Sequence, residues 1–168
     1  MDLKLVKSPN NWLSKQVSPF SFNFLNAKEV EQQMVDLMIQ EGGIGLSANQ
    51  VSLDAQIFVM KPFLLEDKTP FAIINPQVLE VSKETELMPE GCLSHPGLII
   101  HVSRPKNILV KFLDIEANEC IIELTDIDAR CFLHEYDHLH GIEFVNRVSK
   151  LKLDRAKKKL SKRKKVNG

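Results

Sequence analysis

The stretch of this 168-residue chain that most constrains its fold runs from Cys131 to Gly141 and contains the pattern H-E-x-x-H. His134 and His138 are four residues apart, and positions with this spacing share one face of an α-helix. Both imidazoles can therefore reach one metal ion, while Glu135 lies about 100° further round the helix, free to act as an acid or a base. A catalytic metal needs a third protein ligand and an open position for water, so the two histidines are only part of a site.

The helix that carries these histidines has recognisable boundaries in the sequence. Thr125 is a suitable N-cap, Asp128 three positions later resembles the second residue of a capping box, and Gly141 is expected to end the helix. We expect about 15 helical residues, buried on the face that carries Ile127, Cys131 and the two histidines.

The rest of the chain predicts one more helix and several strands. Apolar residues at helical spacing predict a helix over residues 28–41, ended by two glycines. Segments rich in β-branched and aromatic residues predict strands over residues 56–60, 71–74, 77–82, 98–102, 107–114 and 119–124, the last two as a hairpin. Turn-forming residues predict irregular structure over residues 1–26, a glycine-spaced loop over residues 43–50, and a loop or a sharp bend over residues 89–97.

Composition is that of an ordinary globular domain, with 43% apolar and 26% charged residues in a chain long enough to bury a core. No apolar run approaches the roughly 18 residues needed to span a bilayer, and the N-terminus lacks the features of a secretion signal. Three cysteines are an odd count for a disulfide framework and favour free or metal-bound thiols in a reducing compartment. We expect a cytoplasmic protein, with an organelle as the alternative.

The formal net charge of zero conceals a strong asymmetry. Nine of the 22 basic residues and one of the 22 acidic residues lie in residues 151–168, so this tail carries +8 and the rest of the chain −8. We expect a catalytic domain over residues 1–150 and a basic helix or tail over residues 151–168. The tail is interpreted either as a solvated, frayed helix or as a contact for RNA or another polyanion.

Three cysteines compete to be the third metal ligand. Cys131 shares the helix face of the histidines but lies about 10 Å along the axis from His138, so we expect it to line the pocket beside the metal. Cys120 falls in a predicted strand with no neighbouring residues that would support a metal site, and it is expected to be a small core residue. Cys92 follows Gly91, which permits unusual backbone angles and close approach, and Cys92 is the best candidate.

Three separate segments resemble the signature motifs of peptide deformylases. They are residues 43–50 (GIGLSANQ), 90–94 (EGCLS) and 134–138 (HEYDH), in the order and spacing of that family. The resemblance covers about residues 1–160. It implies an α+β fold, in which small antiparallel β-sheets pack around a central helix that carries the H-E-x-x-H motif.

The resemblance also implies a metal-dependent hydrolase that removes the N-formyl group from the N-terminal formylmethionine of new polypeptides and releases formate. The family's metal ligands carry over to Cys92, His134 and His138, and its general base and acid to Glu135. The metal lowers the pKa of its water towards about 7, so that Glu135 can take a proton and the resulting hydroxide can attack the formyl carbon. The expected metal is Fe²⁺, for which Zn²⁺, Ni²⁺ or Co²⁺ can substitute, because ligand type alone does not separate these ions.

The remaining site residues are two further catalytic groups, Gln50 and Leu93, and the residues of a substrate pocket. The resemblance assigns the Gln50 side chain and the Leu93 backbone N–H to the negative charge on the formyl oxygen, where one such donor contributes about 3 kcal/mol. The motif glycines let the backbone approach the peptide, which we expect to pair as an added strand. A slot for the methionine side chain, with ordinary core packing as the alternative, is expected from Ile44, Gly45, Ile127, Arg130 and Cys131.

Several neighbouring positions depart from the family pattern or invite a different role. Ser47 replaces an alanine often found in the first motif, and Leu133 replaces a glutamine; neither change removes a ligand. His95 is expected at the pocket rim, because a fourth ligand would occupy the position of the water. Asp137 is expected to pair with Arg104 behind the site.

Two other functions were weighed against the deformylase interpretation. A metalloprotease with H-E-x-x-H usually takes a histidine or glutamate as its third ligand, and a structural metal site needs four closed ligands and has no use for Glu135 or Gln50. The expected partners are N-formylmethionyl peptides and, through the basic tail, the ribosome. Neither a membrane nor a specific DNA site is expected as a partner.

Overall fold

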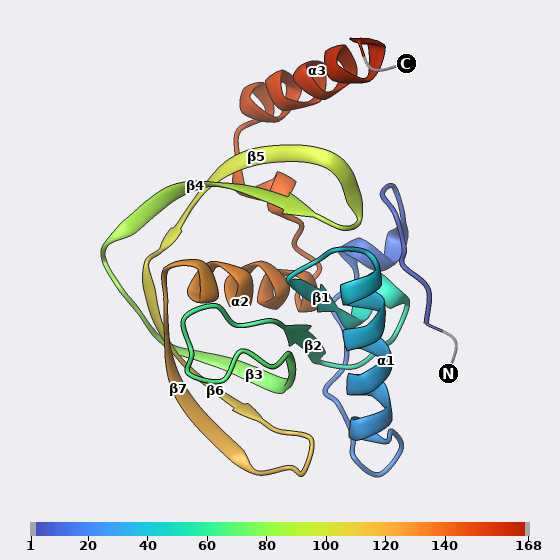
Figure 1. Ribbon diagram of the computed structural model, residues 1–168, viewed down its shortest axis with the longest axis vertical. Helices are drawn as coiled ribbons and strands as arrows, with labels where there is room; N and C mark the ends of the chain where they lie inside the picture. The colour runs from blue at the N-terminus through green and yellow to red at the C-terminus, as the bar shows by residue number, and fades with distance from the viewer. Residues whose placement is uncertain (1–2, 167–168) are drawn as a thin grey trace.

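The computed structural model describes residues 3–166 and places the helix of the H-E-x-x-H motif at the centre of the molecule. This helix, α2 (Asp126–Leu139), lies between a five-stranded antiparallel sheet and a two-stranded antiparallel ribbon (Figure 1). The predicted α+β architecture, with small antiparallel sheets around a central helix, is therefore confirmed.

The five-stranded sheet has the order β1-β2-β3-β6-β7 and is antiparallel throughout. Its strands are β1 (Gly45–Ser47), β2 (Ile57–Met60), β3 (Phe71–Val81), β6 (Asn107–Leu113) and β7 (Glu119–Thr125). The ribbon consists of β4 (Thr85–Cys92) and β5 (His95–Pro105). The other helices are α1 (Ala27–Gln40) and α3 (Lys150–Val166), with short 3₁₀ helices η1 (Asn11–Ser14), η2 (Ala48–Val51) and η3 (Phe144–Arg147).

The two helices and the hairpin predicted from periodicity are present. The Asn26 side chain caps α1 by accepting from the Glu29 N–H at 3.2 Å, and the helix buries Val30, Met34 and Met38 on one face, as the spacing predicts. The hairpin over residues 107–125 pairs β6 with β7 in unbroken register.

The β3 strand is longer than expected. Residues 71–74 and 77–82 were predicted as two strands, but β3 runs through Pro76 without interruption. Its ladder with β6 shifts register between Ile74 and Gln77, where Asn75 adopts a φ of 50°. This β-bulge accommodates a proline that cannot donate to the ladder.

Residues 89–97, predicted as a loop or a sharp bend, form a sharp bend rather than a loop, because most of them belong to β4 and β5. Only Leu93 and Ser94 form the turn between them. Pro89 and Gly91 are tolerated because each strand of a two-stranded ribbon has an unpaired edge. Residues 43–50, predicted as a glycine-spaced loop, contain β1 and most of η2.

The predicted capping box at the start of α2 is not formed. Thr125 is the N-cap, but its side chain makes no capping hydrogen bond. The Asp128 carboxylate instead accepts from the backbone N–H groups of Phe63 and Leu64, both at 2.8 Å. This buried carboxylate therefore fixes the loop between β2 and β3 against α2.

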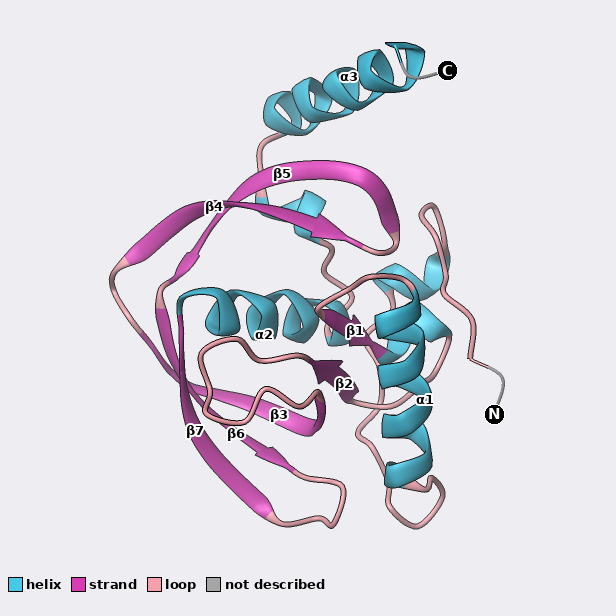
Figure 2. Cartoon of the chain, in the orientation of Figure 1, coloured by secondary structure: helices cyan, strands magenta, loops and turns pink. Residues whose placement is uncertain are grey.

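Two hydrophobic clusters hold these layers together. The larger cluster fills the space between α2, α1 and the five-stranded sheet; Phe58 and Phe132, whose rings meet edge to face at 5.2 Å, lie in it. The smaller cluster contains Leu98, Ile100, Val102 and Phe144, and α3 packs on it through Leu153, Ala156 and Leu160. Figure 2 shows α3 lying across the outer side of β5. Among residues 3–166, no helix is long and apolar enough to cross a membrane.

Candidate active site

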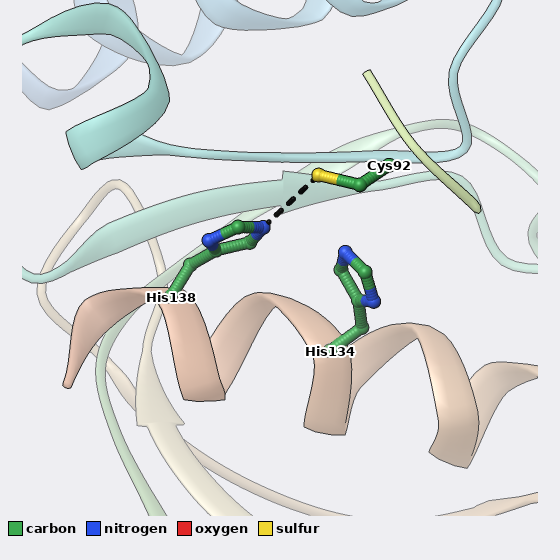
Figure 3. A group of neighbouring side chains, drawn as sticks. All are labelled: Cys92, His134 and His138. Carbon is green, nitrogen blue, oxygen red and sulfur yellow. Dashed lines mark hydrogen bonds between the residues drawn. The ribbon is translucent and has the colours of Figure 1, made fainter. Parts of the chain in front are cut away.

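Three side chains from α2 and the β4–β5 ribbon converge on one point. Cys92 ends β4, and His134 and His138 project from α2 towards it (Figure 3). One ligand atom from each residue lies within 4.8 Å of the other two, and Cys92 Sγ is 3.3 Å from His138 Nε2. Ligands bound to one ion at about 2.0–2.3 Å are roughly 3.5 Å apart in a tetrahedral site. The three predicted ligands are thus brought together in a group that fits one metal ion.

The protonation of the two imidazoles differs. His138 is fully buried, and burial together with the nearby His134 keeps its pKa well below the usual value, so it is a neutral imidazole. Burial also disfavours the charged form of His134, but Cys92 and Glu90 outweigh this effect and raise its pKa. A metal bound here must therefore displace a proton from His134.

Glu90 holds His134 in position. Its Oε2 lies 3.0 Å from His134 Nδ1, which leaves Nε2 of that ring for the metal. The same carboxylate accepts from Arg104 at 2.6 and 3.0 Å and from Arg130 at 2.7 Å. Burial opposes ionisation of Glu90, yet the hydrogen bonds from His134 and Arg104 prevail and lower its pKa to about 2.

A second carboxylate extends this buried network. Asp137, one residue before His138, accepts from Arg104 Nη1 at 2.8 Å, which confirms the predicted pair. It also accepts from Arg147 Nε at 2.8 Å, and Arg147 belongs to η3. The network therefore links β4, β5, α2 and η3 behind the metal ligands.

Glu135 is held beside the ligands by the first motif. Its Oε2 accepts from the Ser47 hydroxyl at 2.7 Å, and its side chain is packed so closely against Gly45 that a Cβ there would lie 2.5 Å from Oε1. Burial raises the pKa of Glu135, although His134 and Ser47 act in the opposite direction. The glycine of the motif is needed here for close approach rather than for an unusual backbone angle.

Gln50 and the β4–β5 turn form the other side of the site. The Gln50 side chain is oriented by accepting from the Ser47 N–H at 2.9 Å. Its Nε2 lies 3.0 Å from Ser94 Oγ and 3.4 Å from Cys92 Sγ. Leu93, between these two residues, lines the same cavity.

A cavity of about 510 Å³ opens over these groups, and all the residues predicted to form the methionine slot line it. The Cys131 thiol donates to the Ile44 carbonyl at 3.4 Å. Burial and nearby carboxylates raise the pKa of this thiol, so Cys131 lines the cavity as an uncharged group. Arg130 also lines the cavity, but its guanidinium is held by Glu90 and by the carbonyl of Val102 at 2.8 Å.

Sequence reasoning missed the partners of the site more than the site itself. Glu90 was noted only as part of a motif, and no local pattern identifies the distant arginines that it binds. Ser47 was interpreted only as a small replacement that removes no ligand, although its hydroxyl donates to the predicted general base Glu135. His95 lies at the cavity as predicted, where it hydrogen-bonds Glu143, and it is not part of the cluster of ligand atoms.

Known proteins share both the sequence and this fold. The sequence model of the polypeptide deformylase family matches residues 2–154. A peptide deformylase of Shewanella oneidensis is 39% identical, with 95% of this chain and 94% of that protein aligned. One from Thermotoga maritima is 36% identical over 88% of each chain. The crystal structure of the Ehrlichia chaffeensis peptide deformylase superposes with a TM-score of 0.83 at 35% identity, covering 99% of both chains.

The matches span nearly the whole chain, and they agree with the thiol, imidazole and carboxylate groups gathered at one cavity. The chain belongs to the polypeptide deformylase family, metal-dependent hydrolases that remove the formyl group from the N-terminal formylmethionine of polypeptides.

Proposed function

We propose that Cys92, His134 and His138 hold the catalytic metal of this deformylase and that Glu135 carries the proton. The observation that supports this assignment is the convergence of one ligand atom each from Cys92, His134 and His138, beside a cavity lined by Cys92, His134 and Glu135. A thiol and two imidazoles leave an open coordination position, which a structural site with four ligands lacks. This donor set also argues against a metalloprotease, whose third ligand is usually a histidine or a carboxylate.

We propose Fe²⁺ as the working metal, with Zn²⁺, Ni²⁺ or Co²⁺ able to occupy the same ligands. When bound, such an ion supplies a water whose pKa is lowered towards about 7 and polarises the formyl oxygen. Neutral His138 is ready to bind the ion, and Glu90 orients His134 for it.

Glu135 is proposed as the group that takes a proton from the attacking water and returns it to the leaving amine. Ser47 donates to Oε2, so Oε1 is the oxygen free to exchange the proton. Burial raises the pKa of this carboxyl, so its carboxylate is a stronger base for the attacking water and holds the proton until the amine takes it.

Gln50 and Leu93 are proposed to stabilise the negative charge that develops on the formyl oxygen. The Gln50 amide has two N–H groups, of which one can bind Ser94 while the other faces the metal ligands. The Leu93 N–H belongs to the tight turn that also carries Cys92, so both donors are fixed before substrate arrives.

The cavity is proposed to accept the formylmethionine side chain. Ile44, Gly45, Ile127 and the neutral thiol of Cys131 form its wall, and the stem of Arg130 lies among them. The backbone of the peptide is proposed to pair with the edge of β1 that faces away from β2, because β1 is the terminal strand of its sheet.

The division into a catalytic domain over residues 1–150 and a basic tail over residues 151–168 is also a proposal. The tail is proposed to contact ribosomal RNA, since it forms α3, whose apolar residues dock on β5 while most of its lysines face solvent. We place the reaction where formylated chains are made, in a bacterial cytoplasm or an organelle.

Formate release from formyl-Met-Ala-Ser tests the assignment. Anaerobically iron-loaded protein is expected to release formate, and Glu135→Ala, with the same metal content, is expected to lose nearly all of this activity. Glu135→Gln is the matched variant that keeps the size of the side chain. Absence of formate from the loaded protein, or full activity in Glu135→Ala, would overturn the proposal. Equal rates for the iron-loaded and zinc-loaded protein would remove the preference for iron.

A further inference from the structure

A hydrogen bond outside the ligand set joins the start of β5, next to the ligand Cys92, to the segment that follows α2. His95 Nε2 and Glu143 Oε2 are 2.5 Å apart, and their side chains are only 12% and 18% exposed. His95 opens β5 and is the register partner of Cys92 across the β4–β5 turn. Glu143 lies five residues after His138, in the segment that leaves α2. This bond therefore connects the strand paired with Cys92 to the segment between α2, which carries the two histidines, and η3.

Aromatic packing reinforces the bond. The Phe144 ring, which is 1% exposed, contacts the His95 ring edge to face at 5.5 Å and the His134 ring at 5.6 Å. Phe144 also belongs to the smaller hydrophobic cluster beneath β5. Because protein interiors are close-packed, a shift of the His95 ring is transmitted through Phe144 to the ring of His134, a proposed metal ligand.

The turn is held from its other side by different groups. Ser94 accepts from the Gln50 side chain at 3.0 Å and, through its carbonyl, from the Ser8 N–H at 2.9 Å. These contacts fix the turn to η2 and to the N-terminal segment, not to the chain that follows α2. Glu143 is itself anchored, since its N–H donates to the Asn146 side chain at 2.9 Å.

We propose that His95 and Glu143 are positioning residues that hold Cys92 close enough to the two histidines for all three to bind one ion, and that they so slow the loss of the metal. The inference rests on the proposed ligand set. Removing one partner leaves a largely buried polar group unsatisfied, whereas replacing both partners by apolar groups can be nearly neutral. The two residues should therefore behave as a coupled pair rather than as independent contributors.

The test measures how fast zinc-loaded protein gives up its ion to an excess of a chromogenic chelator. His95→Phe keeps a ring against Phe144 but cannot bind Glu143, and it is expected to release zinc about tenfold faster, at the low end of what outer-shell changes cost. Glu143→Leu is expected to do the same. The double variant is expected to release zinc no faster than either single variant. Increases that multiply in the double variant, or a wild-type rate in His95→Phe, would overturn the proposal.

Additional variants separate this effect from a general loss of stability. His95→Gln, whose amide can still donate to Glu143, is expected to retain most of the wild-type rate, and it remains informative if His95→Phe fails to fold. His101→Leu changes an exposed histidine in the same strand and is expected to leave the rate of zinc release unchanged.

The absorption spectrum of cobalt-loaded His95→Phe is expected to shift, since the spectrum reports the geometry of the metal ligands; an unchanged spectrum counts against a positioning role for His95. His134→Ala tests the ligand set separately: if it binds zinc as well as the wild type, the proposed function fails, whatever His95 does.

Discussion

The Ser47 hydroxyl donates to Glu135 Oε2 at 2.7 Å, although the two residues are 88 positions apart in the chain. The first motif thus contacts the proposed general base directly, through a side chain that the family pattern often lacks. This hydrogen bond favours the charged form of Glu135 and opposes the effect of burial, which raises the pKa of the same carboxyl.

Ser47→Ala is therefore expected to raise the pKa of Glu135. A general base must be unprotonated to act, so the acidic limb of the profile of kcat/KM against pH should move to higher pH. At a pH on that limb, kcat/KM should fall roughly tenfold. Hydrogen bonds to charged groups contribute about 1.5–3 kcal/mol, and a hydrogen bond from water to Glu135 replaces part of that energy in the variant. Above the limb, the variant should approach wild-type activity. Ser103→Ala, at an exposed position of β5, is the control; a limb that does not move would contradict the assignment.

Gly45→Ala is expected to lower kcat/KM by about tenfold or more, since small displacements of catalytic groups have effects of this size. The new Cβ would lie 2.5 Å from Glu135 Oε1, and Ser47 prevents that carboxylate from moving freely. Gly43→Ala is the matched comparison, because its Cβ would meet the end of the Leu93 side chain, which can rotate away. Similar losses in the two variants, measured as formate release at equal metal content, would argue against a specific role for the contact with Glu135.

Glu90→Gln is expected to weaken metal binding by about 10- to 100-fold, the usual range for an outer-shell partner of a ligating histidine. The amide loses the charge that satisfies Arg104 and Arg130 and holds the His134 ring. Metal-buffered titration measures the effect, with Glu86→Gln as the control, since the Glu86 side chain is exposed on the same strand. Unchanged affinity would show that the ring is oriented by other contacts.

The metal ligands could be predicted from the sequence, whereas the residues that hold them in position could not. The i, i+4 spacing identified His134 and His138, and comparing the three cysteines was enough to select Cys92, because those arguments depend on local geometry. The partners of Glu90 lie 14 and 40 positions away, so only the tertiary fold brings them together. The strand predicted over residues 98–102 lies within β5, whereas β4 and the first residues of β5 were missed, since turn-forming residues are compatible with the unpaired edges of a ribbon.

Metal affinity is expected to rise with pH across the neutral range. In the metal-free site the pKa of His134 is raised, so its imidazole carries a proton that the ion must displace. His138, whose pKa is lowered, contributes no proton. Titrations with Zn²⁺ at several pH values should therefore show tighter binding at higher pH, with protons released into a weakly buffered solution. Affinity that does not depend on pH would mean that the ligands are already unprotonated.

Removing positive charge from the solvent side of α3 is expected to weaken co-sedimentation with ribosomes. Lys157, Lys158, Lys162 and Lys164 are exposed, whereas Leu153, Ala156 and Leu160 dock the helix, so replacing those four lysines by glutamine should leave the fold intact. Each phosphate contact contributes about 0.7–0.9 to the slope of log affinity against log salt, so the variant should show a shallower salt dependence as well as weaker binding.

Deleting residues 151–168 should weaken ribosome binding at least as much as the four substitutions. It also uncovers the cluster of Leu98, Ile100, Val102 and Phe144, so its effect on formate release has to be compared with that of the charge variant. If α3 acts only in docking, the charge variant keeps full activity on formyl-Met-Ala-Ser while losing ribosome binding. If the charge variant co-sediments with ribosomes at the wild-type level over a range of salt concentrations, the lysines of α3 do not bind the ribosome, and α3 is a structural helix packed on β5.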